Sequence, residues 1–555
     1  MTIARPAPAG STTPGPPGPT GSLAAPSTLS HKQILTVLSG LMLGMFLASL
    51  DQTIVSTAMR TIADKLHGQT AQAWVTTAYL ITSTVSTPLY GKLSDLYGRK
   101  PFYLFAIGIF VVGSLLCGTA TSIYELAAYR AVQGIGAGGL LSLAFTIIGD
   151  IVPPRERGRY QAYFMSVFAS SSVLGPVLGG ALAGQSTLFG IDGWRWIFVV
   201  NVPIGIVAFV VVMRVLQLTK TRQQHRIDYL GAGLLSSSIV PVLLVAEKGR
   251  EWGWTSGLSL GLTAVSVVSV VWFVFWERRM GEEAILPLRI FANPVFSITS
   301  ATSLLVGMGM FGGLVTLPLY LQIVHQQSPT RAGLLLIPLM AGIMSASMVC
   351  GKLMRKTGRY RLFPIIGTAT MFSGLLLLAR LTYESPLWHV EVFMVVMGAG
   401  LGMSMQTLII SAQNSLPPKD MGVATGSVTF FRSLGGTFGA AISLAVLFST
   451  VLANIKDRLS TAGVPAAVID RFNGASSIND TSVIASLPPA IKTAVLQGFA
   501  DSTHTTFLVT AALMVPAFVF ALFIKEVPLR QLSGIEAARD EAVEEARAKA
   551  DSAVL

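Results

Sequence analysis

Two ionisable residues lie inside apolar stretches of this sequence. Asp51 stands well within the run from Ile34 to Met59, and Arg130 stands one helical turn into a later run that ends near Ile148. A charged side chain at the centre of a membrane-spanning helix costs about 2.5–3.5 kcal/mol on insertion scales. We therefore expect Arg130 to have an acidic partner, for which Asp51 and Glu125 are the candidates.

Asp51 is the residue that we expect to carry a proton. A buried carboxyl group can hold a proton in one conformation and release it, or meet a cationic substrate, in another. The alternative is a carboxyl group that only makes hydrogen bonds between helices and fixes their packing. Arg432 is a second cation inside an apolar run, and the sequence assigns it no role.

A loop between two apolar runs combines glycines with charges. It reads Gly-Lys-Leu-Ser-Asp-Leu-Tyr-Gly-Arg-Lys and contains Gly91, Asp95, Gly98, Arg99 and Lys100. The glycines permit tight turns and close helix approach, and the aspartate can accept hydrogen bonds from a helix N-terminus or pair with the arginine. We expect these five residues to latch two helical bundles together. A positively charged loop that directs membrane insertion is the other interpretation, and both can hold.

The same frame, Gly-Lys-Leu-x4-Gly-Arg, recurs from Gly351 to Arg359. Because each copy follows the second apolar run of a group of six, the repeat indicates two homologous halves. Arg355 takes the place of Asp95 in the second copy. We therefore expect a stronger latch in the N-terminal half.

Glycines at four-residue spacing mark a helix that packs closely. They form two overlapping faces, Gly175 with Gly179 and Gly180 with Gly184, and Pro176 bends the helix between them. A second pair at this spacing is Gly134 and Gly138.

Polar and aromatic residues inside apolar runs are candidates for lining a substrate cavity. The alternative for most of them is an interfacial anchor or a place in the core. The candidates are Asp51, Trp74, Tyr79, Gln133, Tyr320, Gln322, Gln406 and Asn414.

The composition indicates which kind of structural element positions these residues. Of the 555 residues, 52% are apolar and only 12% are charged, and the mean hydropathy is +0.63. Apolar runs of membrane-spanning length number six between Ile34 and Val215, two between Tyr229 and Trp276, and six between Val295 and Ile524. The sequence therefore predicts an all-α polytopic membrane protein with fourteen spans. The net charge of +12 resides in loops without interleaved aromatic residues, which argues against nucleic acid as a partner.

Charge distribution predicts the orientation. With a cytoplasmic N-terminus, the cytoplasmic loops hold more of the 39 Lys and Arg residues than the opposite loops do. We expect both termini in the cytoplasm. The predicted segments are a disordered tail (1–30), an N-terminal bundle (31–220), two inserted helices (221–285), a C-terminal bundle (286–526) with an extracytoplasmic loop (453–502), and a helical C-terminal tail (527–555).

Several classes of protein are disfavoured. No phosphate-binding loop, His-Glu-x-x-His helix or clustered Ser/His/Asp set occurs, so we expect neither an enzyme nor an ATP-driven pump. Cys117 and Cys350 lie inside apolar runs without neighbouring metal ligands, and we predict inert core residues and no metal. An ion gradient remains as the energy source, with no cofactor.

Four motifs resemble those of the major facilitator superfamily, in its fourteen-span drug:proton antiporter branch. Besides the Gly91 loop they are Leu-Asp-Gln-Thr-Ile-Val-Ser-Thr-Ala from Leu50, Arg-Ala-Val-Gln-Gly-Ile-Gly-Ala-Gly from Arg130, and Gly-Pro-Val-Leu-Gly-Gly from Gly175. The first of these three departs from the family at Ser56 and Arg60, where Asn and Pro are usual. The resemblance covers 34–524 and implies two six-helix bundles plus two inserted helices.

The resemblance also implies a function. Family members of this branch export small molecules in exchange for protons by alternating access, with the arginine at Arg130 in proton coupling and the motif at Gly175, Pro176, Gly179 and Gly180 typical of antiporters. We expect a monomer in a bacterial inner membrane whose partners are a drug-like or amphipathic small molecule, protons and membrane lipid. The alternatives are an exporter of a lipid or an endogenous secondary metabolite, an uptake carrier, and a channel.

Overall fold

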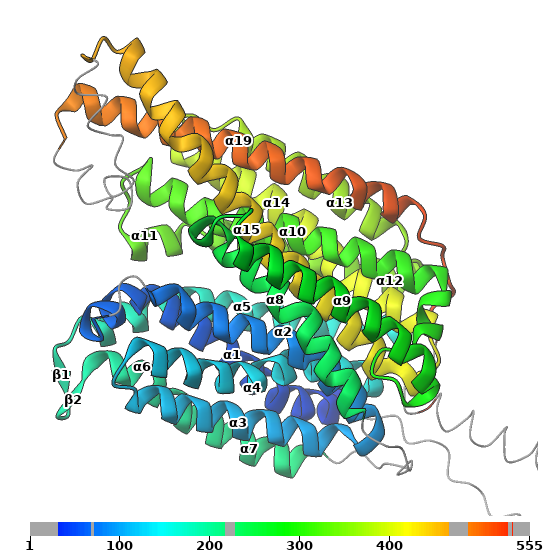
Figure 1. Ribbon diagram of the computed structural model, residues 1–555. Coiled ribbons are helices and arrows are strands. Elements are labelled where there is room, and N and C mark those ends of the chain that lie inside the picture. The colour runs from blue at the N-terminus through cyan, green and yellow to red at the C-terminus, as the bar shows by residue number, and fades with distance from the viewer. Residues whose placement is uncertain (1–30, 68–70, 217–227, 466–486, 531–535, 537–555) are drawn as a thin grey trace, which may run out of the picture.

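The protein is described by a computed structural model that covers residues 31–67, 71–216, 228–465, 487–530 and 536. Figure 1 shows two layers of long helices, one from each half of the chain, with both ends of the described chain on one face of the bundle. We call this the termini face; the β-hairpin of β1 (Thr187–Leu188) and β2 (Ile191–Asp192) marks the opposite face.

The N-terminal half forms one layer. Its helices are α1 (His31–Lys65), α2 (Gln72–Tyr97), α3 (Arg99–Thr119), α4 (Ile123–Ile151), α5 (Pro154–Ala183), the short α6 (Trp196–Val199) and α7 (Asn201–Val215). Within the layer α4 packs against both α2 and α3, and α1 packs against α5 and α7.

The C-terminal half forms the second layer. Its helices are α10 (Pro294–Ile323), the short α11 (Pro329–Leu334), α12 (Ile337–Thr357), α13 (Leu362–Ala379), α14 (Leu387–Ser415), α15 (Met421–Thr461) and α19 (Pro489–Leu522). The two layers meet where α2 contacts α15 and where α5 contacts α12.

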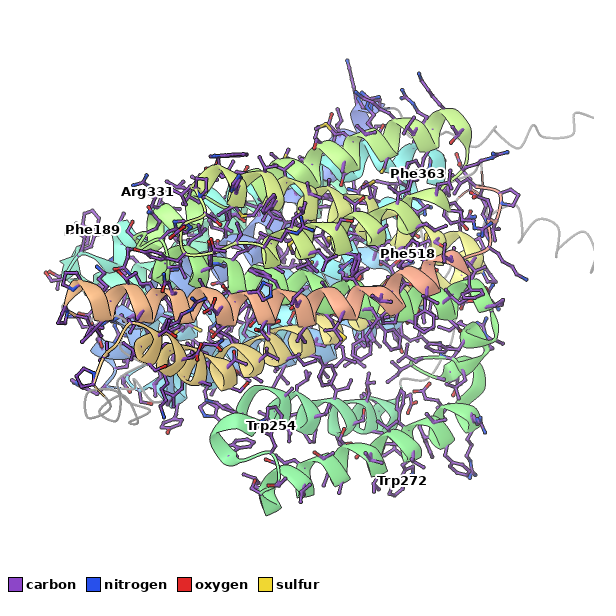
Figure 2. The ribbon with its side chains drawn as sticks, turned by 90° about the horizontal axis from the view of Figure 1, so that it is seen from above. Phe189, Trp254, Trp272, Arg331, Phe363 and Phe518 are labelled. Carbon is purple, nitrogen blue, oxygen red and sulfur yellow. The ribbon has the colours of Figure 1, made fainter. Side chains whose placement is uncertain are left out.

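Two helices lie between the two halves in the sequence and form a hairpin. They are α8 (Tyr229–Trp252) and α9 (Gly257–Met280). Figure 2 shows this pair at the margin of the molecule, with Trp254 and Trp272 on it. α8 contacts α2 and α15, whereas α9 contacts mainly α8. Val268 and Trp272 of α9 are 63% and 56% exposed, as lipid-facing side chains would be.

Thirteen segments among the described residues are long and apolar enough to cross a membrane. The fourteenth predicted span is α2, whose composition is more polar because it carries buried Thr77, Thr84, Ser86 and Thr87. α2 packs against α4 of its own layer and α15 of the other. Its hydroxyl groups therefore lie inside protein, and the fold is the predicted multi-pass helical bundle.

The repeat predicted from the Gly91 and Gly351 loops reappears in the packing. Gly113 of α3 lies against the backbone of Gln133 on α4, and Gly374 of α13 lies in the same way against Met397 on α14. A Cβ added to Gly113 would lie 2.7 Å from the backbone of Gln133, and one added to Gly374 would lie 2.6 Å from the backbone of Met397. The two halves thus share a helix arrangement.

The extracytoplasmic segment predicted at 453–502 is shorter than expected. α15 continues to Thr461 and α19 already begins at Pro489, because Arg458 of α15 and Asp501 of α19 pair across the helices at 2.7 Å. Residues 466–486 lie outside the described part of the chain, as do the predicted tail 1–30 and most of the segment 527–555.

Candidate functional site

The two residues singled out by their burial form an ion pair. Arg130 Nη1 on α4 donates to Asp51 Oδ2 on α1 at 2.5 Å, and the two side chains are 2% and 0% exposed. The other candidate partner, Glu125, instead accepts hydrogen bonds from Tyr129 and from Thr121. Of the two predicted acids, Asp51 is therefore the partner of Arg130.

Amide and hydroxyl groups complete a buried network around this pair. Gln133 Nε2 and Asn201 Nδ2 both donate to Asp51 Oδ1, at 2.9 and 2.7 Å. The Oγ atom of Ser114 accepts from the same two amide groups, at 3.1 and 2.9 Å. Because these residues come from α1, α3, α4 and α7, the Asp51 network ties together four helices of one half.

An aromatic ring covers the cation of this network. The guanidinium carbon of Arg130 lies 4.0 Å from the ring centre of Tyr79 on α2, a cation–π contact. Gln133 Oε1 accepts from Arg130 Nη1 at 2.7 Å and from the Cys117 thiol at 3.7 Å. Cys117 is therefore buried in the core, as predicted, and lies beside the network.

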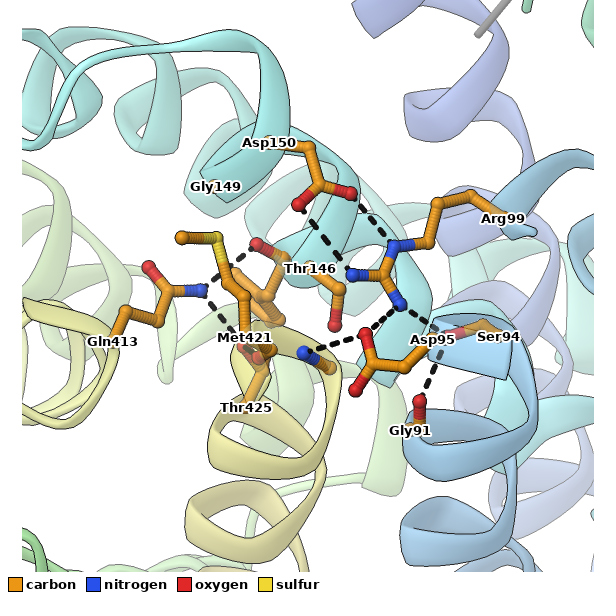
Figure 3. A network of polar contacts seen from close by, with 12 residues as sticks. Gly91, Ser94, Asp95, Arg99, Thr146, Gly149, Asp150, Gln413, Met421 and Thr425 are labelled. Atoms are coloured by element: carbon orange, nitrogen blue, oxygen red, sulfur yellow. Dashed lines mark hydrogen bonds and ion pairs between the residues drawn. The ribbon is translucent and has the colours of Figure 1, made fainter. Parts of the chain in front are cut away.

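The loop predicted to act as a latch does contact both halves (Figure 3). Arg99 pairs with Asp95 at 2.5 Å and with Asp150, at the end of α4, at 2.7 Å. It also donates to Ser94 Oγ at 2.7 Å. The guanidinium is therefore held by two carboxylates from the ends of α2 and α4.

Asp95 also contacts the other half of the molecule. Its carboxylate accepts the backbone N–H groups of Gly422 and Val423, at 3.1 and 2.9 Å, at the N-terminus of α15. A helix N-terminus attracts negative charge through its unpaired N–H groups and its dipole. A Cβ on Gly91 would lie 2.6 Å from the Gly422 oxygen, so glycine is needed for this approach.

The remaining loop residues shape the turn. Gly98 has φ = 104°, a backbone conformation that glycine adopts without strain, at the junction of α2 and α3. Lys100 donates to the Met213 carbonyl of α7 at 2.6 Å. These two residues fix the loop to its own half.

A second bridge between the halves was not predicted. Arg157 at the start of α5 donates to Gln413 Oε1 of α14 at 2.5 Å and to the carbonyls of Gly149 and Val152. Burial lowers the pKa of this guanidinium to about 9, and the nearby Asp150 offsets part of that effect. With the Asp95 contact, this bridge closes the termini face between the layers.

The C-terminal copy of the loop has no such contacts within the described residues. Arg355, which stands in the place of Asp95, and Arg359, in the place of Arg99, are both exposed. The backbone N–H of Arg359 donates to Thr357 Oγ1, but neither guanidinium has a hydrogen bond or ion pair with a described residue. The difference in sequence between the two loops is thus matched by a difference in contacts.

The glycine faces of α5 differ from one another. A Cβ on Gly175 would collide with the Thr53 side chain of α1, and one on Gly179 would lie 2.9 Å from the Ile54 oxygen. Gly180, on the second face, has nothing within 4 Å. Pro176 lies close to Gly333 of α11, so α5 also approaches the other half here.

The predicted cavity residues do not gather in one place. Tyr79 and Gln133 belong to the Asp51 network. Trp74 packs 6.3 Å from Trp252 of α8, and Tyr320 donates to the Thr382 carbonyl within the C-terminal half. Asn414 donates to the carbonyls of Val527 and Pro528, so it anchors the chain after α19.

Three polar residues of the C-terminal half stand apart from these contacts. Gln406 is buried and its Nε2 atom has no hydrogen-bond partner among the described residues. Gln322 and Arg432 are half-buried, and neither side chain forms a hydrogen bond or ion pair within the described part of the chain.

Besides Arg157 and Gln413, the sequence does not single out Asn201, Asp150 or Ser114. Asp150 follows the apolar run that ends near Ile148, and Asn201 interrupts a later run, so a search for every amide or acid inside or just after such runs would find both. Ser114 offers no such signal, because serine is common in membrane-spanning helices.

Comparisons with known proteins agree with this architecture. Residues 41–440 match the Major Facilitator Superfamily. An uncharacterised MFS-type transporter of Mycobacterium tuberculosis is 34% identical over 93% of this chain and 74% of its own length. Multidrug resistance protein 3 of Bacillus subtilis is also 34% identical, over 90% of this chain and 96% of its own.

Among solved structures, that of the proton:xylose symporter XylE with a bound glucose analogue has the same fold. It covers 91% of this chain and 99% of its own, with a TM-score of 0.59 at 15% identity. The two layers, the repeated loops and the matched family together identify the chain as a multi-pass membrane transporter, not an enzyme, that belongs to the Major Facilitator Superfamily.

Proposed function

We propose that this transporter exports drug-like, amphipathic small molecules from a bacterial cytoplasm in exchange for protons. The observation that carries the proposal is the Asp51–Arg130 pair, fully buried and held by Gln133 and Asn201. The names of the relatives support the substrate class, since one at 34% identity is a multidrug resistance protein of Bacillus subtilis.

The chemistry of the pair suggests how a proton would act. Protonation of Asp51 would remove the negative charge that faces Arg130, and a buried unpaired guanidinium is costly. Arg130 would then have to move toward another acceptor or toward water. Movement of Arg130 would also change its contact with Tyr79 on α2.

One helix links this pair to the latch. α4 carries Arg130 near one end and Asp150 at the other, and twenty residues of helix span about 30 Å. Asp150 holds Arg99, and Arg99 holds Asp95 against α15. A shift of α4 that follows protonation would therefore reach the contact between the halves.

We assign the termini face to the cytoplasm, in agreement with the excess of Lys and Arg in its loops. With the Asp95 and Arg157 bridges closed on that face, the present conformation would be the stage that faces outward in this scheme. Protonation of Asp51 from outside would precede opening toward the cytoplasm, and substrate binding there would follow proton release.

The test has two stages. Resistance of a pump-deficient bacterium to chemically varied antibiotics would first identify substrates. The purified chain in vesicles would then be assayed with a pH-sensitive dye for proton release driven by such a substrate. Asp51→Asn should abolish proton release yet retain transport down a substrate gradient.

The matched control is Asp64→Asn, which changes an exposed aspartate on the same helix. It should leave both measurements unchanged. Unaltered proton release in Asp51→Asn would refute coupling through this residue. A bacterium with no altered resistance would instead favour export of a lipid or an endogenous metabolite.

A further inference from the structure

A groove lies where the two halves meet along α5 and α12. It has a volume of about 700 Å³ and opens at the termini face. Its polar rim contains Arg159 of α5 together with Lys352 and Arg355 of α12. Farther along the two helices, toward their middles, the groove is lined by Tyr163, Met344 and Met348, so one end is charged and the other is apolar.

The groove has the length of one membrane leaflet. Its lining on α12 runs from Met344 to Arg355, and eleven residues of helix rise about 16 Å. Its lining on α5 runs from Glu156 to Ser166, about 15 Å. Half of a bilayer hydrocarbon core measures about 15 Å. An acyl chain would therefore fit along the apolar wall with its headgroup at the rim.

The charges of the rim favour an anionic headgroup. Three cations face one carboxylate, that of Glu156, which leaves an excess of positive charge. Lys352 and Arg355 are exposed and have no hydrogen bond or ion pair with a described residue. Among the described residues, Arg159 has only a 3.4 Å contact with His31. Their donors are therefore available to a phosphate group.

We propose that this groove binds an anionic glycerophospholipid of the leaflet at the termini face. The phosphate lies on Arg159, Lys352 and Arg355, and an acyl chain lies along Tyr163, Met344 and Met348. Because the cations come from both halves, one bound lipid joins α5 to α12. The lipid thereby stabilises the closed termini face, in addition to the Asp95 and Arg157 bridges. This proposal rests on the proposed function in one respect only, which is that the leaflet at the termini face is the cytoplasmic one.

A binding measurement tests this proposal without any transport assay. The full chain in detergent is titrated with phosphatidylglycerol or with phosphatidylcholine, and lipid retained by the protein is counted by native mass spectrometry. Phosphatidylglycerol should bind more tightly. The double variant Lys352→Gln/Arg355→Gln should bind it about 25-fold more weakly, since each cation at a membrane surface contributes about fivefold.

A matched double variant controls for the loss of charge. Lys356→Gln/Lys525→Gln removes two exposed lysines of the same face that do not line the groove, and its affinity should stay within about twofold of the native value. An equal loss in both double variants, or equal affinity for both lipids, would overturn the proposal in favour of general attraction to a positive face.

The apolar wall supplies an independent readout. Met348→Trp fills the groove and changes no charge, so it should also weaken binding of phosphatidylglycerol. Inorganic phosphate at millimolar concentration should not displace the lipid. Displacement by phosphate, with native affinity in Met348→Trp, would show an anion site without a lipid. Bound lipid should also slow hydrogen exchange in the first turns of α5, and unchanged exchange would contradict its joining of the halves.

Discussion

The N-terminal and C-terminal halves share a helix arrangement but treat their charges differently. In the N-terminal half Asp51 pairs with Arg130, and Arg99 pairs with two carboxylates. In the C-terminal half the guanidinium groups of Arg355 and Arg432 have no ion pair within the described residues.

Packing shows which positions correspond. Gly113 faces Gln133 as Gly374 faces Met397, so Met397 occupies the place of Gln133. Three residues earlier on each helix stand Arg130 and Met394, both buried. The glycine contacts are thus common to both halves, whereas at these matched positions the N-terminal half has Arg130 and Gln133 and the C-terminal half has two methionines. An ion pair of the C-terminal half, between Arg458 and Asp501, lies elsewhere.

The largest effect should come from breaking the ion pair. Arg130→Met leaves Asp51 buried without its cation, a change that typically costs about 3–5 kcal/mol. Thermal unfolding of the purified chain measures the loss. Met394→Leu, at the corresponding place in the other half, should cost less than about 1.5 kcal/mol, as volume-conserving swaps do.

A second variant separates the pair from general packing damage. Asp51→Asn/Arg130→Met removes both charges, and it should be more stable than Arg130→Met alone. If the double variant unfolds at the same temperature as the single one, lost packing and not an unpaired charge explains the effect.

The latch should show the next largest effect. Asp95→Asn weakens two hydrogen bonds to the N-terminus of α15, and bonds to charged groups contribute about 1.5–3 kcal/mol. Arg99→Gln should act in the same direction. Both should open the termini face, measured as faster hydrogen exchange at the start of α15. Arg359→Gln, in the C-terminal copy, should leave that exchange unchanged; an equal increase would contradict the asymmetry of the two loops.

Glycine contacts should matter in both halves. Gly179→Ala brings a Cβ to 2.9 Å from the Ile54 oxygen on α1, and Gly439→Ala brings a Cβ still closer to the Met308 backbone of α10. Each should lower stability by about 1–3 kcal/mol, the usual cost of overpacking. Gly180→Ala meets no atom within 4 Å and should be neutral or slightly stabilising. A neutral Gly439→Ala would show that the halves pack less alike than their backbones suggest.

Apolar runs and repeated motifs were enough to predict the helical membrane fold and the two halves, because length, hydropathy and spacing depend on local sequence. A charge inside an apolar run likewise indicates that Asp51 and Arg130 each need a partner. The bridge from Arg157 to Gln413 could not be predicted in this way, since these residues are far apart in the chain and common types at span ends.

Side-chain direction explains why several predicted cavity residues lie outside the Asp51 network. A polar residue inside a run indicates that it needs a partner, but it does not say on which face of the helix that partner lies. Tyr320 donates to a backbone carbonyl inside the C-terminal half, and Asn414 donates to a backbone carbonyl of the segment after α19. The loop predicted at 453–502 overlaps the end of α15 and the start of α19 for a similar reason, because α15 continues through polar residues that pair with α19.

The smallest change in stability is expected when two buried glutamines are replaced and compared. Gln133 donates to Asp51 and Ser114, whereas Gln406 of α14 has an Nε2 atom without a partner among the described residues. Gln133→Met should therefore destabilise the chain by about 1–3 kcal/mol, because Asp51 and Ser114 each lose one of their two amide donors and keep only Asn201. Gln406→Met removes an unsatisfied amide and should be neutral or stabilising by about 1 kcal/mol in thermal unfolding.

The same pair of variants also bears on substrate recognition. If Gln406 meets a substrate during transport, Gln406→Met should change which antibiotics the bacterium resists while the protein remains as stable as before. A marked loss of stability in Gln406→Met would mean instead that its amide is satisfied within the fold. The C-terminal half would then contain a polar network of its own. The two halves would differ in where their buried polar networks lie, and not in whether they have one.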